Sequence, residues 1–279
     1  MATAAPSKPA SNRDVIFAAA RQNEPDRYIA ALFAPKDARE DLVTLAAYLG
    51  EIRRIPLAVS DAMLGEIRLQ WWRDTLAAGA QGGLSGNPIA DEMVRVIARH
   101  DLPLALILKP LDAASLELDG EPFSDDAQST SYLDCAEGAA TELSARIMGL
   151  DQAPASTAAL ENGARAYGII RLVLRLPELV SKGRWPVPQA VAASGDPRQL
   201  DEARARAIIR QASEGLCREA NEASVRLAGV NPAILPAALI ASYAKAIRRP
   251  QRDALREPAQ IAPLTRMARL WWASRLGRF

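Results

Sequence analysis

Apolar residues recur at intervals of three and four along almost the whole chain, and this spacing restricts the fold more than any other feature. Leu42, Leu45 and Leu49 share one helix face at this spacing, and Leu235 and Leu239 do the same near the C-terminus. No stretch alternates apolar and polar residues between turn residues, so strands are not expected. The pattern predicts an all-α protein.

Composition and turn residues predict one domain. Apolar residues make up 49% of the 279 residues and charged residues 24%, which is typical of a globular chain with a substantial core. Residues 1–23, which begin with an Ala-, Pro- and Ser-rich stretch, are predicted to form a disordered tail, and residues 24–279 a single helical domain. A helix is expected to start after Pro35 and to end or kink at Pro56, and a loop is expected at 82–88.

The composition disfavours several classes of function. The formal net charge is +1 and there is no Gly-rich phosphate loop, so neither nucleic-acid nor nucleotide binding is expected. Cys135 and Cys217 are isolated and His100 is the only histidine, which leaves no zinc motif and no histidine-based triad. No segment is long and apolar enough to span a bilayer, and the sparse cysteines fit a reducing, cytoplasmic location.

Three segments, taken in order, resemble the squalene/phytoene synthase family. The first is RYIAALFAPKDAREDLVTLAAYLGEIRRI running into MLGEIRLQWWRDTL, and the second contains Tyr132 and Cys135. The third is ARAYGIIRLVLRLPELVSKGRWPVP, with Gly183 and Arg184 in its closing turn. The resemblance implies a helical bundle of the isoprenoid (trans-prenyl) synthase type. In that family, two aspartate-rich motifs hold Mg²⁺ and the diphosphates of two prenyl substrates.

The aspartates that this chemistry requires are missing. No Asp occurs from Leu42 to Ser60, where Glu51 is the only acid, and none occurs from Ala164 to Arg184, where Glu178 is the only acid. Two glutamates among several arginines do not make a site for several Mg²⁺ ions, because such ions need a set of oxygen ligands. The sequence therefore predicts no catalytic residues and no metal site.

Two acidic pairs elsewhere are interpreted as residues of helix starts. Asp37 and Asp41 follow Pro35 in the first turns of a predicted helix, and Asp125 and Asp126 open or precede another. Acidic side chains are favoured there by the helix dipole and by free N–H groups. Metal binding by Asp37 and Asp41 remains the alternative interpretation.

Residues near the two former aspartate motifs are candidates for contacts to a ligand in an ancestral cavity. They are Glu51, Arg54, Arg171, Arg175, Glu178 and Arg184. Arg171 and Arg175 are one helical turn apart and can bind an anion without metal. The alternatives are that these arginines lie on a solvated face, or that they pair with Glu51 and Glu178 and fill the cavity, since inward charges must be paired.

The C-terminal segment LTRMARLWWASRLGRF places arginines around an apolar face. Its candidates for membrane or partner contact are Trp271, Trp272, Arg266 and Arg269. A basic aromatic helix of this kind can lie on an anionic membrane surface. The alternative is a last helix of the bundle with its apolar side packed inward.

Because it lacks both aspartate-rich motifs, the chain resembles a non-catalytic branch of the family. This branch includes a mitochondrial assembly factor for respiratory complex I and bacterial relatives. The resemblance implies a protein without cofactor that supports complex I assembly by contacting its subunits or assembly factors. The expected location is the cytoplasm, with a peripheral contact to the inner membrane face. Two alternatives remain: a Mg²⁺-dependent head-to-head prenyl transferase, and a protein that binds a prenyl chain or lipid.

Overall fold

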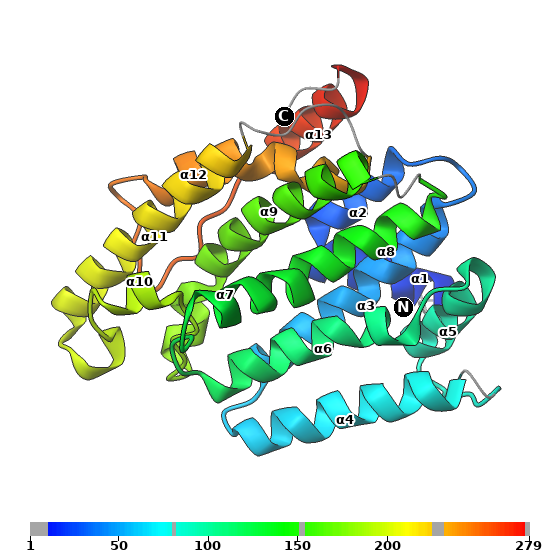
Figure 1. Ribbon diagram of the computed structural model, residues 1–279, viewed down its shortest axis with the longest axis horizontal. Helices are drawn as coiled ribbons and strands as arrows, with labels where there is room; N and C mark the ends of the chain where they lie inside the picture. The colour runs from blue at the N-terminus through cyan, green and yellow to red at the C-terminus, as the bar shows by residue number, and fades with distance from the viewer. Residues whose placement is uncertain (1–10, 80–81, 151–153, 225–231, 277–279) are drawn as a thin grey trace, which may run out of the picture.

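A computed structural model describes residues 11–79, 82–150, 154–224 and 232–276. Every regular element in this part of the chain is helical and none is a strand, which confirms the predicted all-α fold (Figure 1). No helix among these residues is long and apolar enough to cross a membrane. In chain order the elements are α1 (Asn12–Asn23), α2 (Pro25–Leu32), α3 (Arg39–Ala58), α4 (Ala62–Gly79), α5 (Pro88–His100), α6 (Leu104–Asp119), α7 (Asp126–Leu133), the π-helix η1 (Asp134–Gly138), α8 (Ala139–Ile147), α9 (Pro154–Ser181), α10 (Gln189–Ala192), the 3₁₀ helix η2 (Pro197–Gln199), α11 (Glu202–Ser224), the 3₁₀ helix η3 (Pro232–Leu239), α12 (Ile240–Ile247) and α13 (Pro263–Leu276).

Helix α3 is the centre of the first half of the chain. It packs against α1, α2, α5 and α6, and the apolar residues that predicted it, such as Leu45 and Leu49, are fully buried. The Tyr48 hydroxyl donates to the backbone carbonyl of Ile107 at 2.6 Å, and its ring meets Trp72 edge-on at 5.4 Å. The helix ends shortly after Pro56, as the proline predicts.

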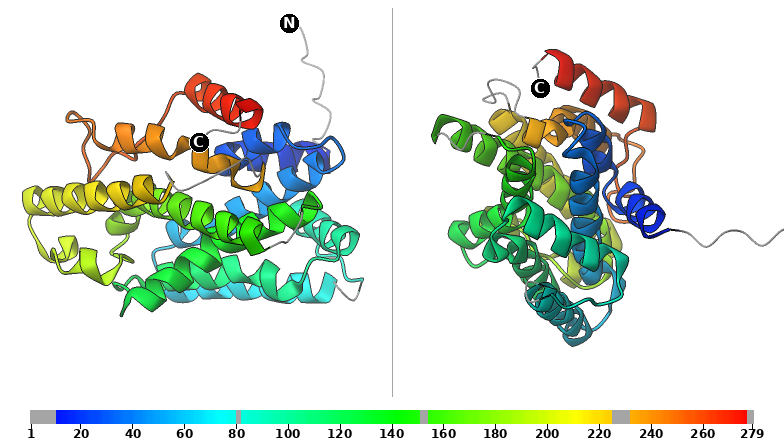
Figure 2. Two further views of the ribbon diagram at one scale, coloured as in Figure 1. Left: turned by 45° about the horizontal axis from the view of Figure 1, so that its top comes forward. Right: turned by 90° about the vertical axis from the view of Figure 1, so that its right-hand side faces the viewer.

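A second apolar cluster forms around α9 and α11, which pack along each other. Trp185, in the turn after α9, is fully buried in this cluster. In Figure 1, α11 and α12 lie at one side of the molecule and α4 at the opposite edge. Helix α13 lies apart from the main bundle and packs on η3 and α2 (Figure 2).

The boundary predicted for the disordered N-terminal tail is wrong. Residues 12–23 form α1, which Ser11 caps. The Ser11 hydroxyl accepts from the Asp14 N–H at 3.2 Å, and the Asp14 carboxylate accepts from the Ser11 N–H at 3.1 Å. Ile16 and Ala20 are buried, which attaches α1 to the bundle. Residues 1–10 of the predicted tail lie outside the described residues.

The helical spacing near the C-terminus is only partly confirmed. Leu235 and Leu239 belong to the 3₁₀ helix η3, and the α-helical conformation begins at Ile240. Pro236 lies inside η3 and has no N–H to donate, which breaks the α-helical hydrogen-bond pattern at this point.

Candidate functional site

Five charged residues meet at the centre of the molecule, where the family's resemblance predicts a substrate cavity. Glu24 lies just before α2, Arg27 in α2, Arg53 in α3, Glu137 in η1 and Arg171 in α9. We call them the arginine–glutamate cluster. Both carboxylates are buried, and Arg27, Arg53 and Arg171 are largely buried.

Each carboxylate of this cluster contacts more than one guanidinium group. Arg53 reaches Glu24 at 2.9 Å and also pairs with Glu137. Arg27 pairs with Glu137, and Arg171 pairs with Glu24 and lies 3.6 Å from Glu137. Three arginines therefore neutralise two glutamates that belong to distant parts of the sequence.

The arginines of the cluster lower the pKa values of its two carboxyl groups. Burial alone would raise the pKa of Glu24, but the charges of Arg171, Arg53 and Arg27 outweigh it and hold the pKa at about 2. Burial likewise opposes ionisation of Glu137, and the same arginines lower its pKa. Both glutamates are therefore ionised near neutral pH, and the cluster is a set of compensated charges.

Arg175 extends this charged region by one helical turn. Its guanidinium donates to the Glu117 carboxylate at 2.6 Å and to the Arg53 carbonyl at 2.7 Å. The second oxygen of Glu117 accepts from the Tyr132 hydroxyl at 2.7 Å. Tyr132 comes from the segment whose resemblance to the family was noted in the sequence, and here it orients a buried acid.

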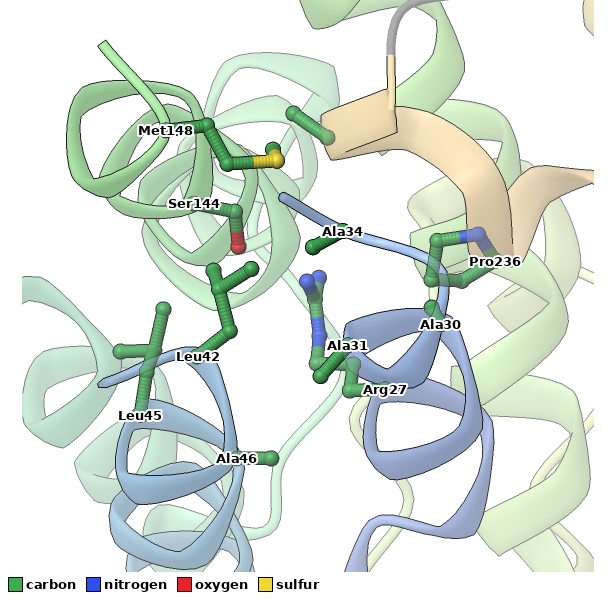
Figure 3. A pocket seen from close by; sticks show the side chains of 11 residues that line it. Arg27, Ala30, Ala31, Ala34, Leu42, Leu45, Ala46, Ser144, Met148 and Pro236 are labelled. Carbon is green, nitrogen blue, oxygen red and sulfur yellow. The ribbon is translucent and has the colours of Figure 1, made fainter. Parts of the chain in front are cut away.

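The space left around the cluster is small. A cavity of about 20 Å³ is bounded by Arg53, Glu117, Tyr132, Arg171 and Arg175, among others, and holds at most about one water molecule. A neighbouring cavity of about 30 Å³ lies beside Arg27, among small and apolar side chains of α2, α3 and α8 (Figure 3). Small-molecule pockets have volumes of roughly 300–1,000 Å³, so neither cavity accommodates a prenyl chain.

The predicted site residues separate into different regions of the structure. Arg171 and Arg175 point into the charged centre, as predicted, but the predicted pairing with Glu51 and Glu178 is wrong. Their acidic partners are Glu24, Glu137 and Glu117. Glu178 is exposed on α9.

Arg184 is buried in the turn after α9. Its guanidinium donates to the carbonyl of Pro56 and, at 3.3 Å, to that of Val59. These contacts fix the end of α3 against the turn. In this arrangement Arg184 satisfies backbone groups and does not face a cavity.

Glu51 and Arg54 lie on the outer side of α3, in a groove between α3 and α4. The groove has a volume of about 210 Å³. We call it the α3–α4 groove, and its lining residues are Glu51, Arg54, Ile55, Ala58, Arg68, Trp71 and Trp72. The candidate ligand contacts at the first former aspartate motif therefore line a surface groove.

The residues present do not fit the magnesium site that the family's chemistry implies. Among the described residues, no group of three or more His, Cys, Asp or Glu side chains could hold a metal ion. The buried acids Glu24, Glu117 and Glu137 all form ion pairs with arginine. Of these carboxylates, Glu24 keeps one oxygen, Oε2, without a hydrogen-bond partner, and a single oxygen beside three guanidinium groups does not make the set of oxygen ligands that Mg²⁺ requires.

The acidic pairs at helix starts differ in their contacts. Asp41, in the first turn of α3, is buried, pairs with Arg99 and lies 2.7 Å from His100 Nε2. Asp37 precedes the helix. Asp125 caps α7 by accepting from the Gln128 N–H at 2.7 Å, with Asp126 in the first turn, as predicted.

Helix α13 has an inner and an outer face. Leu270 and Ala273 are buried, and Arg266, a predicted membrane or partner contact, faces inward and donates to Asp26. Asp26 is buried and also accepts from the Tyr167 and Tyr243 hydroxyls. The exposed outer face carries Leu264, Met267, Arg269, Trp271, Trp272, Arg275 and Leu276.

Sequence reasoning missed Glu24, Glu117 and Glu137. A search for aspartates passed over these glutamates, although each lies within or next to a segment that resembles the family. Their contacts with arginines join residues that are 29 to 147 positions apart, which no local pattern records. The only signal was that inward arginines require buried acids.

The comparisons with known proteins agree with this fold. The model of the squalene/phytoene synthase family matches residues 20–268, so the chain belongs to this family. Among solved structures, a dehydrosqualene synthase in complex with ligand superposes with a TM-score of 0.67 at 13% identity, covering 95% of both chains. Squalene synthase HpnC from Alicyclobacillus acidocaldarius gives a TM-score of 0.56 at 16% identity, over 96% of this chain and 95% of that one.

The curated relatives carry a different description. The protein named NADH dehydrogenase (ubiquinone) complex I, assembly factor 6, from Bos taurus is 24% identical over 171 residues, and its Homo sapiens counterpart is 23% identical over 171 residues. Each match covers 61% of this chain and 51% of the relative. The chain thus spans about half the length of the curated relatives it matches.

Proposed function

We propose that this protein is a non-catalytic member of its family that supports the assembly of respiratory complex I through protein contacts. The observation that carries the proposal is the arginine–glutamate cluster, which occupies the position of the expected substrate cavity with compensated charges. The relatives named as complex I assembly factor 6 support the respiratory role. The partners in this proposal are complex I subunits or other assembly factors.

The two alternatives receive less support. A prenyl transferase needs free carboxylates for Mg²⁺, and the buried glutamates are paired with arginines. A lipid-binding protein needs an apolar cavity, and the cavities beside the cluster measure about 20 and 30 Å³. A role that uses the outer surface is therefore favoured.

The proposal includes a cytoplasmic protein that touches the inner membrane face through α13. The support is the outer face of this helix, where Trp271, Trp272 and Leu276 are exposed beside Arg269 and Arg275. Helix α13 contains no Asp or Glu. Amphipathic helices with basic and aromatic residues bind anionic bilayers through apolar burial and charge attraction.

The respiratory role is tested by deleting the gene in the organism that carries it. Assembled complex I, measured on native gels and as NADH oxidation by membranes, is expected to fall severalfold and to recover when the gene is returned. An unchanged level of complex I in the deletion strain would contradict the proposal.

The non-catalytic role is tested with the purified, folded protein. Incubation with farnesyl or geranylgeranyl diphosphate, Mg²⁺ and NADPH is expected to yield neither squalene nor phytoene. Formation of either product, with loss of that product in Glu24→Gln and Glu117→Gln variants shown to be folded, would restore the enzyme alternative.

A further inference from the structure

Helix α4 has an exposed apolar stripe on its outer side. Its inner side packs on the bundle through buried residues that include Leu69, Trp72 and Leu76, at the edge of the molecule seen in Figure 1. The stripe consists of Met63, Leu64, Ile67 and Trp71, which are 70%, 53%, 60% and 42% exposed.

An edge helix of this kind normally turns polar residues towards water. The first half of α4 is instead apolar on its inner and outer sides. Contiguous exposed apolar residues of this type mark interaction surfaces. Residues 63, 67 and 71 are spaced by four, so their side chains form one row along the helix.

The stripe continues into the α3–α4 groove. Trp71 belongs to both, and the buried side chains of Ile55 and Trp72 line the groove beside it. The groove volume of about 210 Å³ is below the roughly 300–1,000 Å³ of pockets that enclose a small ligand. A groove of this size beside an apolar row suits one or two inserted side chains of a larger partner.

The charges beside the groove are mainly positive. Arg54 has one ion-pair contact, to Glu51 at 3.4 Å, and its side chain is 55% exposed. Arg68 is exposed, and no ion pair of Arg68 occurs among the described residues. Two guanidinium groups against one carboxylate favour a partner that supplies acidic side chains.

A second copy of this chain is a poorer partner for the same surface. In a twofold pairing of antiparallel α4 helices, each long edge of one helix meets the same edge of the other. The edge that carries Arg68 would then meet Arg68 of the other copy, and like charges repel. A heterologous partner with carboxylates at that edge avoids this repulsion.

An anionic membrane is also a poorer partner here. Helix α4 carries Glu66 and the exposed Asp74, and Asp61 is exposed just before its start. Glu66 and Arg68 lie about 200° apart around the helix, so a flat anionic membrane would meet the acidic edge as well as the basic one. A partner helix with carboxylates along one edge meets only the edge of Arg54 and Arg68. Helix α13 has no such acids, which distinguishes the two exposed apolar faces.

We propose that the α3–α4 groove and the α4 stripe bind an amphipathic helix of a partner protein. Apolar side chains of that helix, spaced by three or four residues, pack along Met63, Ile67 and Trp71, and carboxylates on its edge face Arg54 and Arg68. This is the helix-in-groove mode of recognition. It rests on the proposed function, because it assigns the surface through which the protein contacts act.

The test uses two synthetic helical peptides of about the length of α4, which has 18 residues. Both carry leucines at helical spacing; one has glutamates and the other lysines along the same edge. Binding of the dye-labelled peptides to the full chain is measured by fluorescence anisotropy. The glutamate peptide is expected to bind at least about tenfold more tightly than the lysine peptide, which corresponds to about 1.4 kcal/mol.

Variants at exposed positions locate the binding. The double variant Arg54→Ala, Arg68→Ala is expected to remove the preference for glutamate, and Ile67→Ser to weaken both peptides at least about tenfold. Leu264→Ser, an equally apolar exposed position on α13, is the matched control and is expected to bind as the unchanged protein does. Circular dichroism establishes that each variant is folded.

Several results would overturn the inference. They are equal affinity for the two peptides, no binding of either at about millimolar concentration, and unchanged binding by Ile67→Ser. Self-association or binding to phosphatidylglycerol vesicles that Ile67→Ser abolishes would assign the surface to a second copy or to a membrane. If the folded variants restore complex I in the deletion strain, this inference fails and the proposed function stands; if deletion leaves complex I unchanged, the proposed function fails.

Discussion

Arg53 and Arg54 are consecutive residues of α3, yet they belong to two regions with opposite properties. Arg53 is largely buried in the arginine–glutamate cluster and contacts Glu24 and Glu137. Arg54 is exposed in the α3–α4 groove, where its one ion-pair contact, to Glu51, measures 3.4 Å. The charges of the cluster are satisfied within the fold, whereas those of the groove face solvent. The comparison teaches that the inner charges stabilise the bundle and the outer ones are available for binding.

Trp71 and Trp72 show the same division one helix further along. Their rings meet edge-on at 5.2 Å, but Trp72 is buried against Tyr48 and Trp71 is exposed. In each pair of neighbours, one side chain is largely buried and the other is exposed. A helix turns by about 100° per residue, so adjacent side chains necessarily leave in different directions.

The largest expected difference between the two regions is the effect of matched alanine variants on the free energy of unfolding. Arg53→Ala is expected to lower the free energy of unfolding by about 3–5 kcal/mol, because it removes the guanidinium group that contacts both buried carboxylates, Glu24 and Glu137. Arg54→Ala is expected to change it by no more than about 0.5 kcal/mol. Urea denaturation followed by circular dichroism measures both, and similar losses in the two variants would contradict the division.

Lowering the pH is expected to have a second, somewhat smaller effect on stability, and this effect distinguishes the arginine–glutamate cluster from the groove. The pKa of Glu24 is about 2 in the folded protein against a usual 4.5, so its carboxylate contributes about 3 kcal/mol of stability. Because the folded pKa is the lower one, this stability is fully present above pH 4.5 and is lost as the pH falls towards 2. Glu137, whose pKa is also lowered, adds in the same direction.

The measurement is the free energy of unfolding from about pH 6 down to the acid range, by denaturant titration at each pH. Glu51→Gln changes the groove without touching the cluster and serves as the control, with the same pH dependence expected. Stability that stays constant below pH 4.5 would contradict the lowered pKa of Glu24. A pH dependence that Glu51→Gln removes would place the sensitive group in the groove.

The smallest expected effect concerns the affinity of the α3–α4 groove for the glutamate peptide. Glu51→Gln removes the one acid that lines it and leaves Arg54 and Arg68 unopposed. Binding of the glutamate peptide is expected to become about twofold to threefold tighter, which is typical of one partly exposed charge. Anisotropy titration measures the change, and weaker binding would mean that Glu51 itself contacts the partner.

The sequence allowed part of the central site to be predicted. Arg171 and Arg175 are one turn apart on a helix with apolar neighbours; an inward charge pair was one of the interpretations, and both do point inward. Their partners were predicted incorrectly. Glu24 precedes α2 at the first residue of the predicted helical domain, and only the folded structure brings it next to Arg171 of α9.

The α3–α4 groove was harder to predict from the sequence. Glu51 and Arg54 were recognised as candidates because they occupy the former aspartate motif, but their orientation depends on how α3 rotates within the bundle. Pro56 and the short connection from Val59 to Asp61 place α4 against the outer side of α3. The sequence showed no sign that residues of both helices would line one groove.

The sequence by itself determined the helical fold, the family resemblance and the lack of aspartates where Mg²⁺ would bind. These properties follow from local spacing and residue chemistry, which a linear pattern records. The tertiary structure alone decided that Arg53 faces Glu24 and Glu137 while Arg54 faces the surface, and that Arg266 is held inward by Asp26. The physical reason is that the burial and pairing of a charge depend on residues far away in the chain, and only packing brings those residues together.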